Sequence, residues 1–147
     1  MPARRRIDPA AGAQAVRRWA AASETAGDGP AGDGPAGDGP AGDRPAGGGA
    51  PDRRTLATAV RFTLEELAAC APGRAVEVRV PPYGVTQAVA GTVHRRGTPP
   101  SVVETDAGTW LALATGRLAW DQAAADGALH ASGERCDLSA YLPLLRV

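Results

Sequence analysis

The side chains best suited to acid–base chemistry in this sequence are two acids and two histidines. Glu104 and Asp106 lie two positions apart, so in a strand both carboxylates would face one side, where they could bind a cation or transfer a proton. Asp106 also directly precedes an apolar run, which is the position of a helix N-cap. We therefore favour the cap for Asp106 and a surface ion pair for Glu104 over catalysis.

The two histidines occur in contexts that favour the surface. His94 precedes two arginines in a segment ending in Gly-Thr-Pro-Pro, which is typical of a loop. His130 alternates with Leu129 and Ala131, so in a strand it would face away from that apolar pair. We find no phosphate-binding loop, no dinucleotide fingerprint in its strand–turn–helix context, no H-E-x-x-H and no G-x-S-x-G. No catalytic residue is predicted.

The supply of metal ligands and cysteines is small. Cys70 and Cys136 are too few for a disulfide framework, and with only two histidines they are too few for a zinc cluster. Cys70 falls in the last turn of a predicted helix, where a buried structural thiol is expected. The sequence predicts no metal and no cofactor.

The charges balance overall, with 16 basic and 16 acidic residues. Residues 1–19 carry +4, residues 20–52 carry −5 and residues 53–147 carry +1, so the last region is nearly neutral. This balance argues against a nucleic-acid partner. No run approaches the roughly 18 apolar residues of a transmembrane helix, and no apolar segment follows the first arginines as in a signal peptide. We expect a cytoplasmic protein without stable membrane insertion.

Repeats of AGDGP divide the chain. Gly and Pro disfavour regular structure and Asp stays hydrated, so residues 23–51 are predicted to be a disordered linker. Residues 1–22 form a basic tail and a short helix, and residues 52–147 form the folded domain. The first helix is too short to be stable alone, so Trp19 is expected to dock on the domain or on a partner.

The elements follow from apolar periodicity. Asp8, Asp52, Asp106 and Asp137 are placed to cap helices, and Gly73, Gly116 and Gly127 to end them. Alternation of valines with polar residues predicts strands. The predicted helices cover residues 8–24, 52–70, 107–115, 118–126 and 137–147, and the predicted strands cover 75–80, 83–93, 101–105 and 128–134. This order indicates an α+β fold with helices gathered on one face of a sheet.

The segment over residues 104–145 resembles the second half of the sterol carrier protein family. The shared features are an acid before a helix (Asp106), an apolar run ending in Gly116-Arg117, a helix ending at Gly127, a strand ending in Gly133-Glu134 and a Leu-rich end. The segments over 4–12, 55–89 and 96–106 resemble actinobacterial sterol-carrier orthologues. The resemblance implies a mixed sheet of about five strands, helices on one face, and an apolar tunnel between them.

Family members bind sterols, acyl chains or other lipids, or serve as accessory domains of enzymes, so the resemblance favours non-enzymatic binding of an apolar small molecule or lipid. We expect the middle helices and the sheet to line the cavity and a cation to meet a polar headgroup. The predicted binding residues are Trp110, Leu113, Leu118 and Trp120 from the helices, Val78 and Val80 from the sheet, and Arg117 for the headgroup. A first alternative is a protein interaction module that docks a partner through its helical face and the Trp19 helix. An enzyme using Glu104 or His130 ranks third.

Overall fold

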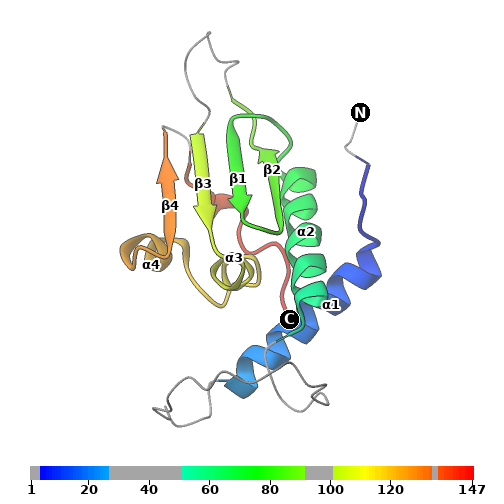
Figure 1. Ribbon diagram of the computed structural model, residues 1–147. Helices are drawn as coiled ribbons and strands as arrows, with labels where there is room; N and C mark the ends of the chain where they lie inside the picture. Colours follow the sequence, from blue (N-terminus) through cyan, green and yellow to red (C-terminus); the bar gives the residue numbers. More distant parts are fainter. Residues whose placement is uncertain (1–3, 27–50, 92–100, 134–135) are drawn as a thin grey trace.

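The computed structural model describes residues 4–26, 51–91, 101–133 and 136–147 (Figure 1). Its elements are, in chain order, α1 (Pro9–Ala26), α2 (Arg53–Cys70), β1 (Val76–Val80), β2 (Gly84–Ala88), β3 (Ser101–Thr105), α3 (Ala107–Ala114), α4 (Trp120–Ala125), β4 (Leu129–Ser132) and the 3-10 helix η1 (Ser139–Tyr141).

The described strands form one mixed sheet in the order β2-β1-β3-β4. The β1–β2 and β3–β4 pairs are antiparallel, whereas β1 and β3 are parallel. The predicted α+β class is therefore confirmed, with four strands in the described residues in place of about five. The predicted strand over 83–93 is shorter than expected, since β2 ends at Ala88, and residues 92–100, which include His94, lie outside the described residues.

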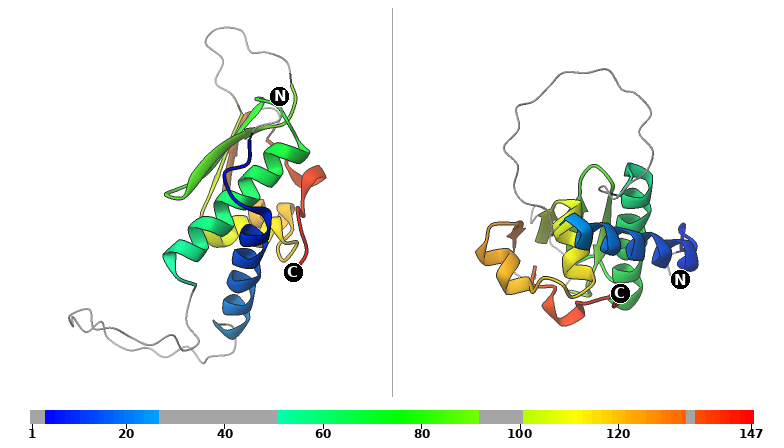
Figure 2. Two further views of the ribbon diagram at one scale, coloured as in Figure 1. Left: turned by 90° about the vertical axis from the view of Figure 1, so that its right-hand side faces the viewer. Right: turned by 90° about the horizontal axis from the view of Figure 1, so that it is seen from below.

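Alternating burial along β1 shows which face of the sheet carries the core. Val76, Val78 and Val80 are fully buried, whereas Glu77 and Arg79 point to the other side. The helix α2 packs on this buried face, as seen from the side in Figure 2. Helices therefore cover the valine face, as the sequence predicted.

An N-terminal cap and a regularly spaced apolar face, both visible in the sequence, account for the helix α2. The Asp52 side chain accepts a hydrogen bond from the Thr55 backbone N–H at 2.6 Å, which caps the first turn. Hydrogen bonds from Thr55 hold the pKa of Asp52 below its usual range. Its core side includes Val60, Leu64 and Leu67, all buried. These apolar positions recur at helical spacing and fix the helix on the sheet.

The first helix docks on the domain, one of the two expectations for Trp19. Trp19 is 7% exposed and belongs to the core, and α1 packs along α2. A Cβ atom at Gly12 would lie 2.2 Å from Cγ of Phe62, so glycine permits this close approach. Upstream of α1, the Glu65 carboxylate accepts hydrogen bonds from the backbone N–H groups of Arg6 and Ile7. The helix continues to Ala26, four residues into the range predicted as linker; the residues from 27 to 50 lie outside the described residues.

Two local predictions are wrong. The predicted closing helix over 137–147 is reduced to η1, because Pro143 cannot donate a backbone hydrogen bond and disfavours helical conformation at Leu142, which is extended. Asp137 accepts a hydrogen bond from the backbone N–H of Ser139 at 2.9 Å, and hydrogen bonding to Ser139 lowers the pKa of Asp137.

Cys70, which was expected to be buried, is exposed in the last turn of α2. Partial burial still raises the pKa of its thiol.

Candidate functional site

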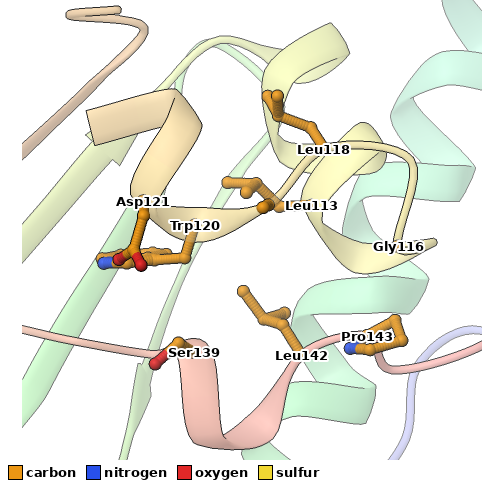
Figure 3. A pocket seen from close by; sticks show the side chains of 9 residues that line it. Leu113, Gly116, Leu118, Trp120, Asp121, Ser139, Leu142 and Pro143 are labelled. Atoms are coloured by element: carbon orange, nitrogen blue, oxygen red, sulfur yellow. The ribbon is translucent and has the colours of Figure 1, made fainter. Parts of the chain in front are cut away.

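A pocket of about 330 Å³ lies between the end of α3, the start of α4 and the segment around η1 (Figure 3). It brings together three of the predicted binding residues, Leu113, Leu118 and Trp120. Its other lining residues were not predicted as binding residues; they are Gly116, Ala119, Asp121, Ser139, Leu142 and Pro143.

The turn after α3 shapes one wall of this pocket. Gly116 adopts a φ of 78°, which glycine tolerates and which ends the helix as predicted. The backbone N–H groups of Arg117 and Leu118 then donate to the Ala112 carbonyl at 2.9 and 3.1 Å. These bonds tie the connection between α3 and α4 to the last turn of α3, so Leu118 is held beside Leu113.

The C-terminal segment closes the opposite wall. The backbone N–H groups of Leu144 and Leu145 donate to the Ala114 carbonyl at 2.8 and 3.2 Å, which fastens this segment to the end of α3. Leu142 and Pro143 lie just before the fastened residues and face the pocket in Figure 3. The pocket therefore depends on pairing of the chain end with a helix that lies about thirty residues earlier.

The other predicted wall residues are part of the packed core. Trp110, Val78 and Val80 are fully buried and belong to the same cluster as α2. The indole N–H of Trp110 donates to the hydroxyl of Thr63 on α2 at 2.8 Å. None of these three residues lines the pocket beside α4, so the structure separates the predicted set into a core group and a pocket group.

Arg117 faces the first helix. Its guanidinium carbon lies 5.6 Å from the centroid of the Trp19 ring, and its Nη2 lies 2.9 Å from a carboxylate oxygen of Glu24. Nη1 also donates to the Ala20 carbonyl at 3.4 Å. Arg117 therefore helps to hold α1 on the domain, and it is not among the residues that line the pocket.

The acidic pair and His130 line a second hollow of about 400 Å³ at the end of β3. Glu104 and His130 lie opposite one another on β3 and β4, and both are exposed. Asp106 is the cap of α3, as predicted: its two oxygens accept from the backbone N–H and the hydroxyl of Thr109 at 2.9 and 2.8 Å. In the described ranges no three His, Cys, Asp or Glu residues are grouped so that they could hold a metal ion.

Loss of the α3 cap has a defined expected cost. We expect Asp106→Ala to lower the free energy of unfolding by about 1 kcal/mol, because the first turn of α3 loses its side-chain acceptor. Asp106→Asn is the matched control, since asparagine caps a helix equally well without the charge. Urea unfolding followed by circular dichroism measures both. Equal losses for the two variants would show that the charge, and not the cap, is what α3 requires.

The pocket residues that the sequence did not predict include Asp121 in the first turn of α4 and Ser139, Leu142 and Pro143 in the C-terminal segment. Gly116 is predicted to end a helix and Leu142 belongs to the Leu-rich C-terminal segment, but the sequence assigns neither to a site. Pro143 was the available signal, because a proline there argues against the predicted closing helix and for an extended segment that can pack across α3. No comparable signal marks Asp121 or Ser139.

The chain matches a known protein family. The model of the family described as bacterial SCP ortholog, where SCP denotes sterol carrier protein, matches residues 52–144. No curated protein matches the chain. The helix α1 lies outside the matched range. In the part of the chain that the structure describes, no helix is long and apolar enough to cross a membrane. Since the match covers most of the chain and the fold agrees with it, the chain belongs to the family of bacterial sterol carrier protein orthologues.

Proposed function

We propose that this protein binds an apolar small molecule or lipid, without converting it chemically, in the pocket between α3, α4 and the C-terminal segment. The observation that carries the proposal is the pocket itself, whose walls include Leu113, Leu118, Trp120 and Leu142. Membership of a sterol carrier family supports the same class of ligand.

A ligand would gain affinity by covering apolar side chains that are only partly buried in the unliganded protein. Leu118, Trp120 and Leu142 are half-buried around the pocket, whereas Leu113 forms its buried floor. A ligand with an apolar body would remove their remaining surface from water, which is favourable in proportion to the area covered. The pocket volume is near the lower end of the range of about 300–1,000 Å³ that is usual for small-molecule sites, which favours a compact ligand.

The two other functions considered have less support. A partner cannot use the Trp19 face of α1 while that face packs on the domain. In the described residues the large apolar side chains that are exposed are Val85 and Val147. Glu104 and His130, the residues of the enzyme alternative, are both exposed, and the nearby Asp106 carboxylate is engaged in the cap of α3. We therefore advance ligand binding alone.

A charge placed at the pocket tests the proposal. We expect Leu118→Arg to weaken binding of 1-decanol at least about tenfold, since an arginine at this half-buried position would occupy the pocket and remove roughly 1.5–3 kcal/mol of apolar contact. Isothermal titration calorimetry measures the affinity, and native mass spectrometry gives the stoichiometry, which should be one ligand per chain.

Val85→Arg is the matched control for this variant. Val85 is 61% exposed on β2, so the same change of charge and size there leaves the pocket unaltered. Both variants should retain the thermal unfolding temperature of the unchanged protein within a few degrees. The proposal is wrong if the unchanged protein takes up no decanol, or if the two arginine variants bind it equally.

A further inference from the structure

One end of the pocket is polar and carries a negative charge. Among its lining residues Asp121 alone is charged, while Ser139 adds a hydroxyl group and Trp120 an indole N–H group. In the view of Figure 3, Asp121 and Ser139 lie at the end of the pocket marked by Trp120, whereas Gly116 and Pro143 lie at the other end. The lining is therefore amphipathic: the side chains with polar groups lie at one end, and the remaining side chains are apolar.

The basic residue nearest to Asp121 in the sequence does not neutralise the charge of Asp121. Arg117, four residues before Asp121, directs its guanidinium to Glu24 and the Trp19 ring of α1. In the described part of the chain Asp121 takes part in no ion pair. Its place in the first turn of α4 suits the helix dipole. Asp121 is exposed, so this role leaves its carboxylate available to a ligand.

We propose that the pocket selects ligands whose polar end donates a hydrogen bond, an alcohol or an amine, and discriminates against ligands that end in a carboxylate. This inference rests on the proposed function and specifies its ligand class. An ionised carboxylate has no hydrogen to donate to Asp121, and it adds a like charge beside it. An alcohol donates to Asp121 and can also accept from Ser139, and an ammonium group adds attraction of opposite charges.

The expected selectivity follows from the exposure of Asp121. One unit charge at about 4 Å from another in a water-like medium changes an affinity by roughly fivefold. Attraction of an ammonium group and repulsion of a carboxylate therefore add to a difference of about 25-fold between an amine and an acid with the same chain. Because the group is exposed, this difference should shrink as the salt concentration rises.

The experiment compares three ligands with one apolar chain. Decylamine, 1-decanol and decanoate are titrated at pH 7 and low ionic strength into the full chain, into Asp121→Asn and into Asp126→Asn, with calorimetry as the readout. Asp126 is exposed just after the other end of α4 and bonds to Gln122, so its replacement changes the net charge equally but outside the pocket. A thermal melt of each variant confirms that α4 and the fold are retained.

The inference requires a particular order of affinities. The unchanged protein and Asp126→Asn should bind decylamine about 25-fold more tightly than decanoate, with decanol between them, and Asp121→Asn should bring the three affinities within a fewfold of one another. Decanoate binding as tightly as decanol and decylamine would overturn the inference and leave the proposed function standing. An equal loss of discrimination in both variants would also overturn it. Failure of all three ligands to bind would refute the proposed function, and the inference with it.

Discussion

Replacing Trp110 with alanine is expected to lower the free energy of unfolding by about 3–5 kcal/mol. The side chain is fully buried in the core that α2 and α3 share with the sheet, so its removal leaves a cavity that the neighbours cannot fill. Urea unfolding monitored by circular dichroism gives the free energy directly. A loss below about 1 kcal/mol would show that Trp110 is not packed in the core.

The hydrogen bond of Trp110 adds a second, separable effect. The Thr63 hydroxyl accepts from the indole N–H and itself donates to backbone carbonyl oxygens of α2. Thr63→Val keeps the side-chain shape but leaves a buried donor without its acceptor, which should cost about 1–3 kcal/mol. Combining it with Trp110→Phe removes both partners, so the double variant should lose less stability than the sum of the two single variants.

Replacing Trp19 with alanine is expected to release α1 from the domain. Trp19 is the largest of the buried apolar side chains of α1, and its removal should cost up to about 3–5 kcal/mol, limited by the free energy with which α1 docks. Hydrogen exchange should then become faster throughout residues 9–26, while the strands β1 and β3 keep their protection. Mass spectrometry of peptides after exchange measures both regions in one experiment.

Two further variants locate the origin of this effect. Arg17→Ala changes an exposed residue of α1 and should leave exchange unaltered. Arg117→Met removes the contact with the Trp19 ring and the ion pair with Glu24, and should accelerate exchange of α1 less than Trp19→Ala does. Unchanged exchange of α1 in Trp19→Ala would contradict the packing described above.

The elements with strong local signals could be predicted from the sequence. The spacing of Val60, Leu64 and Leu67 fixes the buried face of α2, and the alternation of valines fixes that of β1. Asp52 and Asp106 each precede a helix and each caps it. These features depend on neighbours within a few residues, so the sequence itself displays them.

The candidate site could be predicted only in part, because contacts between distant segments create it. The carbonyl oxygen of Ala114 accepts hydrogen bonds from the backbone N–H groups of Leu144 and Leu145. Nothing in the local sequence pattern of either segment specifies this pairing. Arg117 was expected to meet a headgroup, but it pairs with Glu24, which lies 93 residues away. The spacing of Trp110 with Leu113 correctly indicates an inward face of α3, yet only the three-dimensional packing shows that the tryptophan fills the core while the leucine reaches the pocket.

Titration of 1-decanol into protein with isotopically labelled leucine and valine methyl groups, followed by nuclear magnetic resonance, tests the central claim most directly. We predict that the methyl signals of Leu113, Leu118 and Leu142 shift with a single saturating dependence on ligand, while those of Val78 and Val80 stay in place. Shifts confined to the two valines would place the ligand between the sheet and α2 and contradict the assigned pocket. An absence of shifts at saturating decanol would contradict ligand binding itself.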